Sequence, residues 1–181
     1  TRGGGNELSL AMDLRYASKE QAFFAQPEVG TGILPGGGGA ERLPRLIGRD
    51  RALEVILTSQ DYDAQTAERF GWITRAVPDE ELDRFVDAVA ARLASFDKEA
   101  LIAAKNQVNR ASLPPEADLK AAYGEYTRSL GWMGVRERLP KLGKLVGEKP
   151  AVLPAKYKNG SELSAEVKPG SNTIPFQLSS K

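Results

Sequence analysis

Two glutamates, Glu7 and Glu28, stand beside glycine-rich segments and are the carboxylates best placed for acid/base chemistry. The chain opens "TRGGGNELSLAMD", so three glycines lead into Glu7 and an apolar run with helical spacing. Glu28 follows Pro27 at the head of "PEVGTGILPGGGG". Two carboxylates that converge can act as an acid/base pair, because like charges close together keep one of them protonated. Spacing alone leaves their convergence open: Glu7 can simply complement a helix dipole, and Glu28 can be a solvated loop charge.

The glycines in front of Glu7 can supply a second element of catalysis. At the first turn of a helix the backbone N–H groups have no partner within the helix, and glycine lets a ligand approach them closely. Aimed at a carbonyl oxygen, such groups form an oxyanion hole, in which one donor typically lowers the barrier by about 3 kcal/mol. The same glycines are equally consistent with a tight turn from strand to helix.

Composition narrows the chemistry that remains. The 181 residues contain neither Cys nor His, which excludes Ser-His and Cys-His nucleophiles and thiolate or imidazole metal sites. The formal net charge of +1 gives no strong field for nucleic acid or an anionic membrane, and no apolar run is long enough to span a bilayer. Carboxylates, lysines, hydroxyls and backbone amides are therefore the candidate catalytic groups.

Other glycine-rich and basic runs admit a phosphate-binding interpretation, which we consider weaker. Gly30, Gly32 and Gly36 form G-x-G-x-x-x-G, one residue longer than the dinucleotide fingerprint, with no strand directly before it and no G-K-[ST] after it. The runs "RLPRLIGRDR" and "RERLPKLGK" favour solvated helix faces, with a site for a ligand's phosphate as the alternative.

The elements that would position these residues are short strands and glycine loops, followed by helices. We expect a loop over 27–39, a short helix at most over 41–47, broken by Pro44, and a helix capped by Asp63 that ends before Gly71. The remaining predictions are a helix over 6–14, strands over 16–18, 22–25 and 72–77, and helices over 49–57, from 78–79 to about 93, over 98–110 and over 116–130. This order predicts a mixed α/β half-domain with a helical C-terminal cap.

The character of the chain changes at Pro150. The last segment carries scattered Lys and Ser and no sustained period, with prolines at Pro150, Pro154, Pro169 and Pro175. Such a segment buries too little apolar surface to offset its ordering entropy. We therefore predict one domain over 1–149, with its helical cap at about 79–147, and a flexible tail over 150–181.

Three blocks, taken in order, resemble the enoyl-CoA hydratase/isomerase (crotonase) superfamily. They are "GGGNELSLAMDLRYAS", "FFAQPEVGTGILPGGGGAERLPRLIG" and "ALEVILTSQDYDAQTAERFGWITRAVPDEEL". The resemblance covers about residues 1–147 and weakens after Pro114. It implies an α/β fold, a crotonase-like ββα-spiral that lacks its N-terminal half, followed by a C-terminal helical region.

The resemblance also implies roles for four residues. Gly4 would supply an oxyanion N–H, and Gly36 would lie against the acyl group. Glu7 would activate water for the β-carbon, while Glu28 would deliver a proton to the α-carbon, and the presence of both glutamates is typical of hydratase members. The substrate would be an enoyl-CoA thioester, with no cofactor besides the coenzyme A that it carries. The family further implies a homo-oligomer, a trimer or hexamer, in the cytoplasm or in an organellar matrix.

Two departures from the family qualify this interpretation. One extra residue stands beside Phe23 and Phe24, which can reshape the acyl pocket. Nothing matches the family's first half, which holds the second oxyanion donor and most of the CoA surface. We therefore expect an incomplete chain that is inactive alone, in which the strands over 14–25 lack partners and leave Phe23 and Phe24 exposed. The alternative is a non-catalytic remnant or an oligomerisation module.

Overall fold

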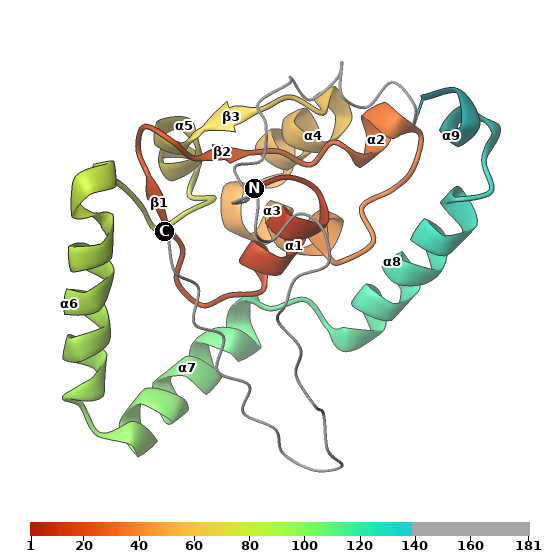
Figure 1. The fold of residues 1–181 in the computed structure, drawn as a ribbon. Helices are drawn as coiled ribbons and strands as arrows, with labels where there is room; N and C mark the ends of the chain where they lie inside the picture. Colours follow the sequence, from red (N-terminus) through yellow and green to blue (C-terminus); the bar gives the residue numbers. More distant parts are fainter. Residues whose placement is uncertain (139–181) are drawn as a thin grey trace, which may run out of the picture. The chain divides into compact units, whose positions relative to one another are not determined.

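The computed structural model describes residues 1–138, and the fold below is that of these residues (Figure 1). The predicted tail over 150–181 and the end of the predicted cap lie outside them. Along the chain the elements are α1 (Gly4–Leu10), β1 (Tyr16–Ser18), β2 (Phe23–Phe24), α2 (Glu28–Thr31), α3 (Gly39–Ile47), α4 (Arg49–Thr58), β3 (Tyr62–Asp63), α5 (Ala64–Phe70), β4 (Arg75–Val77), a 3-10 turn (Asp79–Glu81), α6 (Leu82–Ala94), α7 (Lys98–Ser112), α8 (Glu116–Ser129) and α9 (Met133–Arg138). None of the helices described here is long and apolar enough to cross a membrane.

The strands form two small sheets, each joining an early segment to a later one. β1 pairs with β4 in parallel, with Ala17 opposite Ala76, and β2 pairs with β3 in antiparallel, with Phe24 opposite Tyr62. The expectation that the strands over 14–25 lack partners is therefore wrong, because β3 and β4 supply the ladder hydrogen bonds from within the chain. Phe24 is correspondingly buried rather than exposed, and Phe23 is partly buried.

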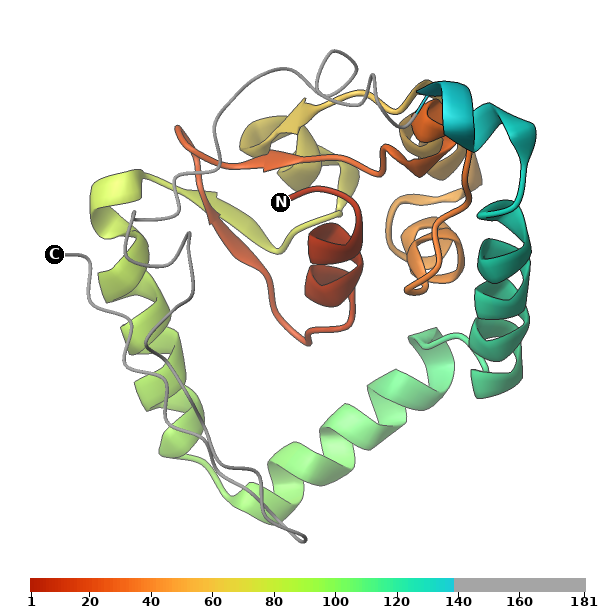
Figure 2. The same cartoon turned by 45° about the vertical axis from the view of Figure 1, so that its right-hand side comes forward.

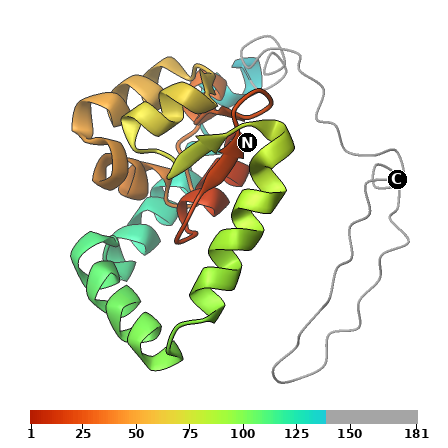
Figure 3. The same cartoon turned by 90° about the vertical axis from the view of Figure 1, so that its left-hand side faces the viewer.

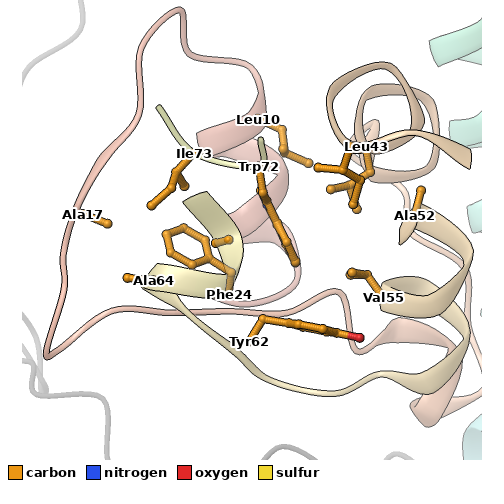
Figure 4. Packing of buried hydrophobic residues seen from close by; sticks show 12 residues of the cluster. Leu10, Ala17, Phe24, Leu43, Ala52, Val55, Tyr62, Ala64, Trp72 and Ile73 are labelled. Atoms are coloured by element: carbon orange, nitrogen blue, oxygen red, sulfur yellow. The ribbon is translucent and has the colours of Figure 1, made fainter. Parts of the chain in front are cut away.

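The hydrophobic core lies where α1, β2, α3, α4 and α5 meet (Figure 4). Trp72 is fully buried at its centre, with its ring centroid 5.7 Å from that of Phe24 and 5.9 Å from that of Tyr62. Leu43 and Val55 are also fully buried. The helices and the sheet pairings thus meet around one indole ring, which links β2, β3 and the segment before β4.

Local signals explain several element boundaries and their exceptions. Asp63 caps α5 by accepting a hydrogen bond from the Thr66 N–H at 2.7 Å, and Gly71 ends it with φ 81°, both as predicted. Two predictions were wrong: the loop over 27–39 contains the short helix α2, and α3 runs continuously through Pro44. Buried side chains on both sides of the proline, Leu43 and Ile47, hold that helix in the core despite the missing N–H.

The helical C-terminal part follows β4 as successive helices (Figures 2 and 3). α6 begins beside β1, where the rings of Tyr16 and Phe85 meet edge to face at 5.1 Å. Neither α6 nor α7 has a buried residue. α8 returns to the first part of the chain, where the Leu34 N–H donates to the Ser129 hydroxyl at 3.2 Å.

Candidate functional site

Glu7 lies in α1 and holds the glycine loop that precedes α3. Its Oε1 accepts hydrogen bonds from the N–H groups of Gly37 at 2.8 Å and Gly39 at 2.9 Å. The Glu7 side chain is 6% exposed. A Cβ at Gly37 would lie 2.7 Å from Glu7 Oε2, so this approach of loop to carboxylate requires glycine. The loop thus satisfies one oxygen of a nearly buried carboxylate and leaves the other available.

Glu28 is the first residue of α2 and lies beside the N-terminal turn of α1. Its Oε2 accepts a hydrogen bond from Gln26 Nε2 at 3.0 Å. Its Oε1 faces Gly3, where an added Cβ would lie 2.9 Å from that oxygen. The structure therefore brings Glu28 next to the glycines that precede Glu7, on the side of the chain where α1 begins.

The charge of Glu7 influences the ionisation of Glu28. Burial raises the pKa of Glu28, and the negative charge of Glu7 raises that pKa further. The hydrogen bond from Gln26 acts in the opposite direction, because it stabilises the carboxylate. Glu28 is therefore a carboxyl that keeps its proton to a higher pH than a solvated glutamate, and a water shared by the two glutamates stays a prediction.

Gly4 begins α1 with an available backbone donor. Gly3 precedes it with φ 54°, a left-handed conformation that glycine adopts at little cost, and the Gly3 N–H donates to the Ala25 carbonyl at 3.1 Å. The N–H groups of Gly5 and Asn6 both donate to the Arg2 carbonyl. Within residues 1–138 the Gly4 N–H has no acceptor, and an added Cβ there would meet nothing within 4 Å. The Gly4 N–H is therefore a donor without an acceptor in this part of the chain, one residue after Gly3, which Glu28 Oε1 faces.

Gly36, the fourth predicted site residue, packs against α8. A Cβ at this position would collide with the ring of Tyr126. The loop between α2 and α3 thus lies flat against an aromatic side chain that is distant in sequence. The structure explains the glycine by this packing, and contact of Gly36 with an acyl group stays a prediction.

Sequence reasoning missed a buried polar chain behind Glu28. Trp72 Nε1 donates to Asn6 Oδ1 at 3.0 Å, and Asn6 Nδ2 donates to Gln26 Oε1 at 2.6 Å. All three side chains are fully buried. The available signal was an amide residue one position before Glu7 and two positions before Glu28, because buried amides need partners. Nothing in the spacing connects them to Trp72.

A cavity of about 680 Å³ lies apart from the two glutamates, neither of which lines it. Residues following α1 form its wall together with parts of α3, α6 and α7. Arg42 and Arg45 from the predicted basic run line it too, and Arg42 Nη1 also donates to the Gly37 carbonyl at 3.0 Å. One of these arginines therefore supports the glycine loop as well as facing the cavity. In the part of the chain that the structure describes, no group of acidic side chains could hold a metal ion.

The described elements form an α/β protein of crotonase-like fold. The family model "Enoyl-CoA hydratase/isomerase" matches residues 1–127, and the chain belongs to this family. This confirms the family that the three sequence blocks indicated.

Proteins of known sequence and structure agree with this assignment. Over 109 residues the chain is 45% identical to a Rhizobium meliloti (strain 1021) protein named "Probable enoyl-CoA hydratase" and 40% identical to "Enoyl-CoA hydratase, mitochondrial" from Pongo abelii; each alignment covers 60% of this chain, and they cover 42% and 37% of those proteins. A crystal structure from Streptomyces avermitilis, assigned as an enoyl-CoA hydratase, superposes with a TM-score of 0.77 at 48% identity, over 83% of this chain and 54% of that one. The chain thus spans about half the length, or less, of the relatives that it matches.

Proposed function

We propose that this protein acts on an enoyl-CoA thioester, adding water to its double bond or shifting that bond, with Glu7 and Glu28 as the acid/base pair. One observation carries the proposal: the charge of Glu7 raises the pKa of Glu28, whose Oε1 faces Gly3, next to the Gly4 N–H that has no acceptor among the described residues. The family match and the names of the relatives support the substrate class. The thioester brings its own coenzyme A, and the proposed reaction uses no other cofactor.

The proposed hydration distributes the work among three groups. The Gly4 N–H donates to the thioester oxygen and stabilises the negative charge that forms there. Glu7 takes a proton from water, whose oxygen bonds to the β-carbon, and Glu28 gives its proton to the α-carbon. Solvent then restores both protonation states, so that the net change is the addition of one water. Because Gly37 and Gly39 occupy Glu7 Oε1, Oε2 is the oxygen assigned to the water.

The proposed reaction also needs a second oxyanion donor and a CoA-binding surface, which we assign to residues outside this sequence. An oxyanion hole commonly uses two donors, and the resemblance assigns the second one, with most of the CoA surface, to a family segment without a counterpart here. Loss of one donor costs about 3 kcal/mol, or on the order of a hundredfold in rate. We therefore propose that the chain alone is inactive and that the complete site forms in the whole protein, as a homo-oligomer.

A second candidate function is an oligomerisation module without catalysis. Exposed apolar side chains on helices favour it: Ile102 and Val108 on α7 are 47% and 64% exposed. Such side chains suit a protein interface better than water. The two candidates differ in whether the glutamates matter for turnover.

Crotonyl-CoA hydration, followed by absorbance, tests the proposal on this chain and on a full-length version. In the full-length protein, Glu28→Gln should abolish both hydration and exchange of the α-proton, each by at least about a hundredfold. Glu7→Gln should reduce hydration more than exchange, because water activation is its assigned role. Glu99→Gln, on exposed α7, is the matched control and should leave both rates unchanged.

Two results would count against the proposal. Full turnover in Glu28→Gln would remove that residue from the mechanism. A folded full-length protein without any turnover of enoyl-CoA substrates would favour the oligomerisation module.

A further inference from the structure

Trp72, Asn6, Gln26 and Glu28 form a chain of hydrogen bonds, and the donor at Trp72 determines which group donates at every later step. An indole N–H can donate a hydrogen bond but cannot accept one. Trp72 Nε1 faces the side-chain amide of Asn6, so the oxygen of that amide must point toward the indole. The Asn6 NH2 group then faces Gln26, which must present its own oxygen in turn.

The same logic fixes the last link. With Gln26 Oε1 occupied by Asn6, the Gln26 NH2 group faces Glu28 and donates to Oε2 at 3.0 Å. Reversing Asn6 would turn its NH2 group toward the indole N–H of Trp72. Reversing Gln26 would turn its NH2 group toward the NH2 group of Asn6. Either change would place two donors against each other. Such a conflict would be costly, because Trp72, Asn6 and Gln26 are fully buried and shielded from bulk solvent.

The end of the chain leaves the two oxygens of Glu28 unequal. Oε2 must act as an acceptor, since a donor is held against it. Oε1 faces Gly3, at the turn that presents the Gly4 N–H. We propose that Trp72 is a positioning residue, which acts through Asn6 and Gln26 to fix Glu28 Oε2 as an acceptor and to leave Oε1 as the atom that holds and releases the proton.

This arrangement has a consequence for the ionisation of Glu28. Donation from Gln26 stabilises the carboxylate and so lowers the pKa of Glu28 from the value that burial alone would produce. Among the described residues, the charged group that acts on Glu28 is Glu7 on α1, which raises this pKa. If the indole donor is lost, Asn6 and Gln26 can both turn, and the Gln26 oxygen can then face Glu28 and favour its protonated form.

Carboxyl 13C NMR of the full chain tests this inference without any enzyme assay. The Glu28 signal is assigned by its absence in Glu28→Gln, and its pKa is then measured in wild type, Trp72→Phe and Tyr62→Phe. Trp72→Phe removes the donor and should raise the pKa of Glu28. Tyr62→Phe is the matched control, because Tyr62 packs on the same indole but donates to Glu54 at 3.2 Å, and it should leave that pKa unchanged.

A measurement on the wild-type chain covers the case in which Trp72→Phe does not fold. The side-chain amide signals of Gln26 and Asn6 and the indole N–H signal of Trp72 should all shift with one pH midpoint, that of Glu28. A Trp72 indole signal that ignores the Glu28 titration would overturn the proposal, as would an unchanged pKa in a folded Trp72→Phe variant.

The role of Oε1 in proton transfer rests on the proposed function, whereas the hydrogen-bond direction does not. In the full-length protein, the limb of the pH–rate profile that belongs to Glu28 should move to higher pH in Trp72→Phe and stay in place in Tyr62→Phe. If the Trp72, Asn6 and Gln26 signals follow the Glu28 titration but the protein shows no turnover, the hydrogen-bond direction is supported and the proposed reaction is contradicted. If Trp72→Phe shows turnover but the Glu28 limb of its pH–rate profile does not move, the positioning role of Trp72 is contradicted and the proposed reaction is supported.

Discussion

The part of the chain from α1 to β4 and the helices α6 and α7 use hydrophobic residues in opposite ways. The first part buries a core around Trp72, together with polar groups such as Asn6, Glu7 and Gln26. In α6 and α7 no residue is buried, and in α8 only Ser129 is. Both parts nevertheless carry apolar residues at helical spacing. An amphipathic pattern therefore specifies a helix, but it does not specify what covers the apolar face.

The largest expected contrast comes from one substitution made in both parts. Val55 on α4 is fully buried, and Val108 on α7 is 64% exposed. Val55→Ala should lower the free energy of unfolding by between about 2 and 3 kcal/mol, through lost apolar burial and the cavity left behind. Val108→Ala should be neutral or stabilising by a few tenths of a kcal/mol, roughly, since alanine is the better helix former. Urea unfolding of both variants measures the difference.

Equal losses of unfolding free energy in Val55→Ala and Val108→Ala would contradict the contrast between a buried and an exposed valine. They would mean that Val108 is covered in solution, for instance by another copy of the chain. Repeating the measurement of Val108→Ala over a range of protein concentrations separates these cases, because only an intermolecular contact makes the loss depend on concentration.

A structural feature can be predicted from this sequence when the residues that determine it lie close together along the chain. Asp63 and Gly71 mark the ends of α5 within a few residues of the helix itself, and the structure confirms both. The strand pairings were missed because Phe24 meets Tyr62 across a long stretch of chain, and no local signal records that contact. Glu7 and Glu28 were chosen as site candidates from their glycine neighbours, and their roles stay predictions, whereas the link from Trp72 to Gln26 depends on tertiary packing alone.

A pair of glycine substitutions probes the contact by which α8 returns to the first part. Gly36→Ala would drive a methyl into the Tyr126 ring and should cost about 1 to 2 kcal/mol of unfolding free energy. Gly124→Ala, within α8 itself, meets nothing within 4 Å and should stabilise by up to about 1 kcal/mol. Adding Tyr126→Ala to Gly36→Ala should recover part of the loss, and thermal melts of the single and double variants would measure it. A loss of the same size with Tyr126 absent would show that the ring is not the obstacle.

Two matched helix caps test whether the helices unfold together. Asp63 accepts from the Thr66 N–H at 2.7 Å in front of α5, and Asp97 accepts from the Ala100 N–H at 2.8 Å in front of α7. Removing either cap with alanine should cost its helix about 1 kcal/mol. For Asp63→Ala the loss should appear in global unfolding, because α5 packs on the core. For Asp97→Ala it should appear only as faster hydrogen exchange in α7, and a fall in global stability would instead join α7 to the cooperative core.

The Asp63 cap adds a pH dependence to this test. Its hydrogen bond from Thr66 lowers the pKa of Asp63 below the ordinary value. A depressed carboxylate pKa contributes stability above the unfolded-state pKa, and this contribution is lost as pH falls through the folded-state pKa. The difference between wild type and Asp63→Ala should therefore shrink in acid.

The smallest expected effect belongs to an ion pair that joins the two parts directly. Lys105 Nζ on α7 lies 2.5 Å from Asp13 Oδ2, in the segment after α1, and both side chains are more than half exposed. Water and salt screen such a pair, and holding two long side chains in place costs entropy, so a double-mutant cycle with Asp13→Asn and Lys105→Met should give a coupling below about 0.5 kcal/mol. The coupling should fall further at high ionic strength. A value well above 1 kcal/mol that resists salt would require a desolvated pair, and hence an α7 held much closer to the core than its exposed residues indicate.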